Sequence, residues 1–138
     1  MTTPADELRT AAQTLLDLAK AATPGPWRQH DTHLGQYGYT ATVLSGEGND
    51  TDLRAWLPSM SQKPWDETRN VWPDAAYIAA VHPGVGLALA DLLQAVANDP
   101  DDETLNEPGS ARHGGCDRTT CPAAATLAVA RAINGTAS

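Results

Sequence analysis

The segment Thr23-Pro-Gly-Pro-Trp27 constrains the fold of this chain most strongly, because its two prolines flank a single glycine. Proline lacks a backbone N–H and disfavours the α conformation of the residue before it. Any helix that begins upstream must therefore end at this segment. The residues that follow it, as far as Leu57, have the composition of short strands and turns instead.

Residues 4–22 are predicted to form an amphipathic helix that ends at this corner. Thr3 suits the N-cap, Pro4 suits the first helical position, and Asp6 is placed to complete a capping box. Apolar residues recur near the 3.6-residue helical period, which predicts one buried stripe. The stripe consists of Leu8, Ala11, Ala12, Leu15, Leu16, Leu18, Ala19 and Ala22.

Three further helices are predicted in the second half of the chain. Proline stands at a first-turn position in each of them, and Gly135 follows the last one as a suitable C-terminal stop. In the second of these helices, Pro83 opens the helix and His82 lies near its cap. The three helices are expected over residues 73–81, about 83–98 and 122 to about 134.

Short β-like runs separated by glycines occupy the region after the corner. Alternation of residue types around Ala41 and Val43 predicts a strand with one buried face. Residues 46–52 are expected to form a solvated turn, and residues 58–70 and 99–120 are expected to be flexible. The predicted strands cover residues 27–34, 37–44 and 53–57.

The order of these elements predicts one α+β domain over residues 1–138. Its antiparallel sheet of two or three strands is expected to pack against about four helices. A chain of 138 residues is long enough to bury a hydrophobic core of its own.

The net charge of −8, from 17 acidic and 9 basic residues, opposes direct binding to nucleic acid or to anionic lipid. An acidic protein that mimics DNA phosphates is an alternative, although the acids are scattered rather than arranged in rows. No stretch reaches the ~18 apolar residues of a membrane span, and the first residues lack the pattern of a signal peptide. We therefore expect a cytoplasmic protein without a membrane partner.

The strongest candidate for chemistry is His113-Gly-Gly-Cys116-Asp-Arg-Thr-Thr-Cys121. The imidazole of His113 and the thiols of Cys116 and Cys121 are ligands that Zn²⁺ prefers, and a structural site needs a fourth ligand. His82, or one of His30 and His33, would have to reach the site through the fold. Two alternatives stay open, which are a disulfide between the cysteines and a pair of packed reduced thiols.

Other candidate motifs are weaker. The turn His82-Pro-Gly-Val-Gly86 starts a helix and offers free N–H groups to an anion, but it lacks the lysine of a phosphate loop. The acids Asp101, Asp102 and Glu103 are expected to be solvated, without the burial or charged neighbour that catalysis requires. Trp56, Trp65 and Trp72 flank a proline-rich loop, and together with His82 they are candidate binding residues. The alternative for the tryptophans is to fill a core without phenylalanine.

Three stretches of this sequence resemble small phage and prophage accessory-region proteins of the Ead-like type, in their actinophage versions. They are Ala22-Thr-Pro-Gly-Pro-Trp27, Asp74-Ala-Ala-Tyr-Ile-Ala-Ala-Val-His-Pro83 and the ending that runs from Cys116 through Cys121-Pro-Ala-Ala-Ala-Thr-Leu-Ala-Val-Ala-Arg131. The first two stretches are structural motifs. In the first of them, the proline corner places Trp27 in the core. The resemblance implies a dispensable phage gene whose product acts in the host cell, and it implies no catalytic residues.

We expect a non-enzymatic phage accessory protein that binds a host protein or sequesters a small ligand. Neither a serine nucleophile motif nor a tuned carboxylate pair is present in the sequence. A homo-oligomer is also expected, because a small open sheet leaves strand edges to cover. The alternatives are a zinc-dependent enzyme or zinc-stabilised domain that uses His113, Cys116 and Cys121, and a protein of the virion.

Overall fold

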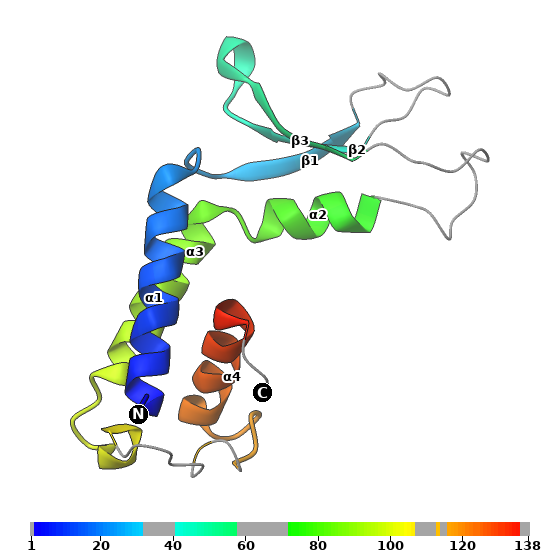
Figure 1. The fold of residues 1–138 in the computed structure, drawn as a ribbon. Helices are drawn as coiled ribbons and strands as arrows, with labels where there is room; N and C mark the ends of the chain where they lie inside the picture. Colours follow the sequence, from blue (N-terminus) through cyan, green and yellow to red (C-terminus); the bar gives the residue numbers. More distant parts are fainter. Residues whose placement is uncertain (1, 32–40, 58–71, 107–112, 114–115, 136–138) are drawn as a thin grey trace. The chain divides into compact units, whose positions relative to one another are not determined.

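The computed structural model describes residues 2–31, 41–57, 72–106, 113 and 116–135 (Figure 1). These residues form two compact units, one of Met1–Ala21 with Gly86–Ser138 and one of Ala22–Val85. The first unit is helical, and the second contains the sheet. The α+β class predicted from the sequence is confirmed, whereas the single domain over residues 1–138 stays a prediction.

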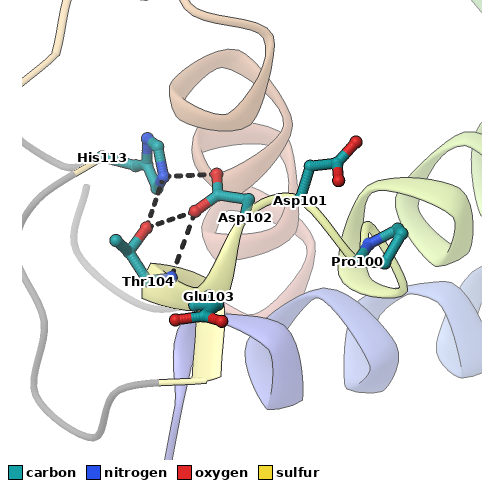
Figure 2. A pocket seen from close by; sticks show the side chains of 6 residues that line it. All are labelled: Pro100, Asp101, Asp102, Glu103, Thr104 and His113. Carbon is teal, nitrogen blue, oxygen red and sulfur yellow. Dashed lines mark hydrogen bonds and ion pairs between the residues drawn. The ribbon is translucent and has the colours of Figure 1, made fainter.

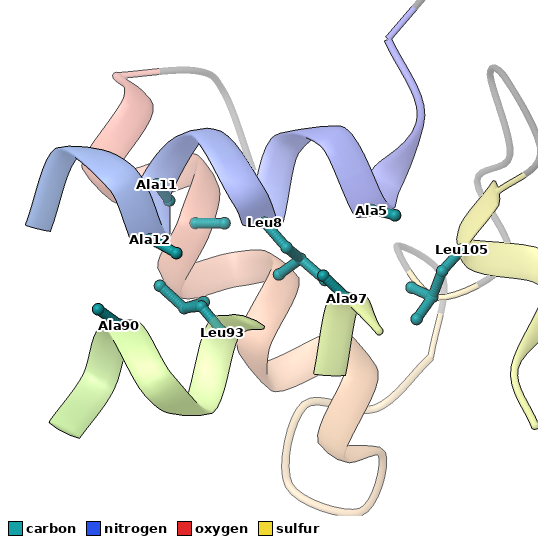
Figure 3. Close-up of a cluster of buried hydrophobic side chains, with 9 residues drawn as sticks. Ala5, Leu8, Ala11, Ala12, Ala90, Leu93, Ala97 and Leu105 are labelled. Atoms are coloured by element: carbon teal, nitrogen blue, oxygen red, sulfur yellow. The ribbon is translucent and has the colours of Figure 1, made fainter. Parts of the chain in front are cut away.

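The helical unit is built from α1 (Pro4–Ala21), most of α3 (Pro83–Ala97), the short 3₁₀ helix η3 (Glu103–Asn106) and α4 (Pro122–Asn134). Figure 3 shows Leu8 of α1 pointing toward α3. Most of the buried side chains are alanines, and such small residues let helix backbones approach closely. The core consists of Ala5, Leu8, Ala11, Ala12, Ala90, Leu93, Ala97, Leu105 and Ala130.

The N-terminus of α1 is closed by the capping box that the sequence predicts. The backbone N–H of Thr3 donates to Asp6 Oδ2 over 3.2 Å, and the N–H of Asp6 donates to Thr3 Oγ1 over 3.1 Å. Hydrogen bonds from the backbone and the side chain of Thr3 to the Asp6 carboxylate hold the pKa of this carboxyl below its ordinary value. All four predicted helices are confirmed, with their ends within one residue of the expected positions.

Polar contacts fasten α1 to the neighbouring helices of its unit. The Arg131 guanidinium of α4 forms two hydrogen bonds of 3.3 Å to the Glu7 carboxylate, and Asn134 donates to the Glu7 carbonyl over 3.0 Å. Arg9 donates to the carbonyl of Ala97 at the end of α3 over 3.2 Å. The C-terminal helix therefore packs along α1, although more than a hundred residues separate them in the chain.

The sheet of the second unit has three antiparallel strands, within the two or three that the sequence predicts, and their order is β1-β2-β3. Helix α2 (Trp72–Ala80) covers one face of it (Figure 1). Between these two layers lie the buried residues Ala41, Val43, Ala75 and Ala79, with Trp27, Ala55, Leu57, Trp72 and Ile78 around them. The strands are β1 (Trp27–Asp31), β2 (Ala41–Ser45) and β3 (Asp52–Leu57).

Strand β2 differs from its predicted pattern, because all five of its residues are buried rather than one face alone. It is the central strand, so both of its edges are covered by neighbours. The polar side chain of Thr42 is buried at no cost in lost hydrogen bonds, since its hydroxyl donates to the carbonyl of His30 over 2.7 Å. After β2, residues 46–50 are exposed and include the 3₁₀ helix η1 (Gly48–Asp50), which confirms a solvated turn there.

The proline corner is packed against the start of α3. Trp27 packs against the core of the sheet unit, as predicted, and its indole N–H donates to the carbonyl of Thr23 over 3.2 Å. A Cβ atom on Gly25 would lie 2.1 Å from Nδ1 of His82, so any other residue there would force the His82 ring to move. The corner therefore depends on Gly25 as much as on its prolines.

In the described part of the chain, no single helix is both long enough and apolar enough to cross a membrane. Helices α2 and α3 reach that length and apolar composition only when they are joined across the break between them.

Candidate metal centre

Backbone hydrogen bonds join His113 to Cys116 and close a turn from Asp117 to Cys121. The N–H of Cys116 donates to the carbonyl of His113 over 3.3 Å, and the N–H of Cys121 donates to the carbonyl of Asp117 over 2.9 Å. The Asp117 carboxylate also accepts the N–H of Thr119 over 2.9 Å. The turn from Asp117 to Cys121 brings Cys121 back toward Cys116.

Cys121 is the N-cap residue of α4. The backbone N–H of Ala124 donates to Cys121 Sγ over 3.4 Å, so the sulfur takes the part that a serine or aspartate oxygen usually plays. This hydrogen bond lowers the pKa of the Cys121 thiol, and hydrogen bonds with His113 and Cys116 lower it further. A thiolate at this position also faces the positive end of the helix dipole.

The imidazole of His113 bridges Cys121 to the segment before η3. Its Nδ1 lies 3.5 Å from Cys121 Sγ, and its Nε2 lies 2.7 Å from Asp102 Oδ2 and 2.8 Å from Thr104 Oγ1 (Figure 2). Since an aspartate oxygen can only accept, Nε2 carries a proton, and in the neutral ring Nδ1 presents its lone pair toward the sulfur. This tautomer is the one in which Nδ1 can bind a metal ion.

Asp102 is held in place by Thr104. The N–H of Thr104 donates to Asp102 Oδ1 over 3.2 Å, and the Thr104 hydroxyl donates to the same oxygen. The hydroxyl bond lowers the pKa of the Asp102 carboxyl, and the positive charge that His113 carries when its ring is protonated lowers it to a smaller extent. The carboxylate therefore stays ionised, as a fixed partner for the His113 ring.

The three ligand atoms of His113, Cys116 and Cys121 all lie within 4.8 Å of one another. Tetrahedral Zn²⁺ has Zn–S bonds of about 2.3 Å and Zn–N bonds of about 2.0 Å, which separates sulfur from nitrogen by about 3.5 Å. The Nδ1–Sγ distance of 3.5 Å between His113 and Cys121 agrees with that separation. The group can hold a metal ion, as the sequence motif predicts.

An open pocket of about 590 Å³ lies on the Nε2 side of His113. It is lined by Pro100, Asp101, Asp102, Glu103, Thr104 and His113 (Figure 2). Asp101 and Glu103 are exposed, whereas Asp102 and Thr104 are half-buried. The pocket gives solvent access to the carboxylate that orients the histidine.

The prediction that Asp102 is solvated without a charged neighbour is wrong. The side chain of Asp102 is 22% exposed and is paired with His113. Leu105 is fully buried in the helical core. Its burial holds the preceding turn, which contains Asp102, against the helical unit. The Asp102-x-Thr104 spacing, which is typical of a side-chain-to-backbone turn, is the signal in the sequence that points to this local order.

The other predicted site residues lie in or near the sheet unit. His82 accepts the N–H of Gly84 on Nδ1 over 3.1 Å, so it caps α3, and His30 is an exposed residue of β1. Trp72 packs against the sheet core, as the core-filling alternative predicts, whereas Trp56 is 58% exposed. His33 and Trp65, with all of the predicted flexible segment 58–70, lie outside the described residues.

No protein-family model, no curated protein and no solved structure matches this chain. The resemblance to Ead-like phage proteins stays a prediction.

Proposed function

We propose that the helical unit is a zinc-binding module in which His113, Cys116 and Cys121 hold one Zn²⁺ ion. The observation that carries this proposal is the convergence of one imidazole and two thiols, with the imidazole already oriented by Asp102. The ion would join His113 and Cys116 to Cys121 at the N-terminus of α4.

The donor set favours zinc over the common hard cations. Thiolate sulfur and imidazole nitrogen select Zn²⁺, whereas Mg²⁺ and Ca²⁺ prefer oxygen. Histidines that bind metals usually donate their other ring N–H to a carboxylate or carbonyl, and Asp102 supplies that carboxylate here. The cluster therefore contains the metal ligands together with the carboxylate that orients one of them.

Two thiolates favour a structural role for the ion. Their two negative charges balance the charge of Zn²⁺ and weaken its ability to polarise a bound water. The ligands also come from a turn and a helix start, so the metal would cross-link these two backbone segments. Because an ion that binds only the folded state stabilises it, we expect zinc to raise the unfolding midpoint of this unit.

The zinc content of the purified full-length chain tests this proposal. After incubation with zinc and removal of the excess, the wild-type protein is expected to retain about one equivalent. The variants Cys121→Ser and His113→Ala are each expected to retain far less, because each lacks one of three ligands. The matched control is His30→Ala, which removes an exposed histidine of β1 and should leave the zinc content unchanged. Equal zinc content in wild type and Cys121→Ser would contradict the proposal.

A second candidate function concerns the sheet unit, where we propose a non-enzymatic role in binding another protein. The observation that favours it is the exposed indole of Trp56 on β3. Trp56 is paired with Thr42, and side chains alternate between the faces of a sheet, so it lies opposite the face that α2 covers. Exposed tryptophans are enriched among the residues that dominate binding energy in protein interfaces.

Pull-down from an actinobacterial lysate tests the second candidate with Trp56→Ala. A protein that co-purifies with the wild-type chain is expected to be lost with this variant. Tyr77→Ala is the control, because Tyr77 is an aromatic residue of α2 that is 70% exposed. Equal capture by the wild type and both variants would exclude Trp56 as the binding residue.

A further inference from the structure

We infer that oxidation of the two thiols controls zinc at this site, because Cys116 and Cys121 can close to a disulfide only by releasing the ion. This inference rests on the proposed zinc binding and adds a regulation to it. Each sulfur can complete either a Zn–S bond of the site or the S–S bond, so the two states exclude each other.

The geometry brings the two sulfurs close enough for either state. Both Sγ atoms belong to the group of ligand atoms that lie within 4.8 Å of one another. The turn between the cysteines is closed by the N–H of Cys121, which donates to the carbonyl of Asp117 over 2.9 Å. A disulfide needs an S–S distance of about 2.05 Å, which side-chain rotation within such a turn can supply.

The two sulfurs differ in access. Cys116 is exposed, whereas Cys121 is half-buried between the N–H of Ala124 and the ring of His113. An oxidant from solution therefore reaches Cys116 first. Cys121 is then the thiol that resolves the oxidised intermediate.

The oxidant is a hydroperoxide, of which hydrogen peroxide is the simplest. The sulfur of Cys116 attacks one peroxide oxygen, the O–O bond breaks, and the products are a sulfenic acid on Cys116 and one water after protonation. Cys121 then attacks the Cys116 sulfur, forms the S–S bond and displaces the hydroxyl group as a second water. Two thiolates lose two electrons, the peroxide gains two electrons and two protons, and the Zn²⁺ ion leaves without any change in its charge.

The remaining ligand keeps its place after this reaction. His113 is tied to Asp102 and Thr104 by hydrogen bonds that involve neither cysteine. Reduction of the disulfide would therefore rebuild the site around an oriented imidazole. We expect the release of zinc to be reversible for this reason.

Peroxide treatment of the zinc-loaded full-length chain tests the inference. Released zinc is followed with a metal-sensitive dye, and peptide mass spectrometry after thiol alkylation identifies the bond between Cys116 and Cys121. We expect about one equivalent of zinc to be released for each disulfide formed, and a thiol reductant to restore binding. Cys121→Ser should stop at a Cys116 sulfenic acid that a dimedone-type reagent traps.

Three results would overturn the inference. Zinc that leaves while both cysteines pass to higher acids without a disulfide shows that oxidation damages the site rather than switching it. A disulfide that forms while zinc stays bound shows that the two states do not exclude each other. A protein that holds no zinc before oxidation overturns the proposed function itself, and this inference falls with it.

Discussion

Replacing Leu8 with alanine is expected to lower the free energy of unfolding of the helical unit by about 2–5 kcal/mol. Leu8 is fully buried in the core that α1 shares with α3 (Figure 3). Its loss removes apolar contacts and leaves a cavity, because neighbours such as Ala12 and Ala90 are too small to fill the space. Urea denaturation followed by far-ultraviolet circular dichroism measures the change.

Leu18→Ala is the matched control for this substitution. Leu18 belongs to the same helix and undergoes the same change in side chain, but it is 64% exposed. Its replacement is expected to change the free energy of unfolding by less than about 0.5 kcal/mol. An equal loss of stability in both variants would show that α1 does not bury the face described here.

Replacing Asp102 with asparagine is expected to weaken zinc binding by about 10–100-fold. The amide has the same shape, but it carries no charge to hold the proton on Nε2 of His113, and it can present an N–H to the ring instead. The imidazole would then spend part of its time with Nδ1 protonated and turned away from Cys121. Competition with a chelator of known zinc affinity measures the effect.

Asp101→Asn separates this role of Asp102 from the loss of one negative charge. Asp101 lies next to it and lines the same pocket, but its side chain is exposed. We expect its replacement to leave the affinity for zinc within about twofold, because exposed charges are screened by solvent and salt. If both variants weaken binding equally, the effect of Asp102 is one of total charge and not of its bond to His113.

The helices could be predicted from the sequence because their signals are local. Thr3 and Asp6 form the expected capping box, and Pro83 and Pro122 open their helices at the expected positions. The convergence of His113, Cys116 and Cys121 could also be predicted from the sequence, because a short turn brings residues of that spacing together. Signals of this kind involve residues only a few positions apart.

The pairing of Asp102 with His113 could not be predicted in this way. It depends on where the turn before η3 comes to lie, and the burial of Leu105 in the helical core decides that position. The burial of all five β2 residues could not be predicted either, because alternation along one strand does not show what other segments cover. Contacts between segments set both features.

The groups around His113 hold one another in fixed orientations. A carboxylate fixes one nitrogen of the ring, the other nitrogen faces a sulfur that caps α4, and a turn adds the second sulfur. Each contact orients a group that would otherwise rotate freely, so a metal ion that binds there finds its ligands already placed. This preorganisation is the basis of the proposed zinc affinity.

X-ray absorption spectroscopy at the zinc edge tests this account most directly, with the metal-loaded full-length chain. We predict two sulfur ligands at about 2.3 Å and one imidazole nitrogen at about 2.0–2.1 Å, with a light atom as the fourth ligand. A spectrum of oxygen and nitrogen ligands alone, without sulfur, would contradict the account and would mark the bound zinc as adventitious.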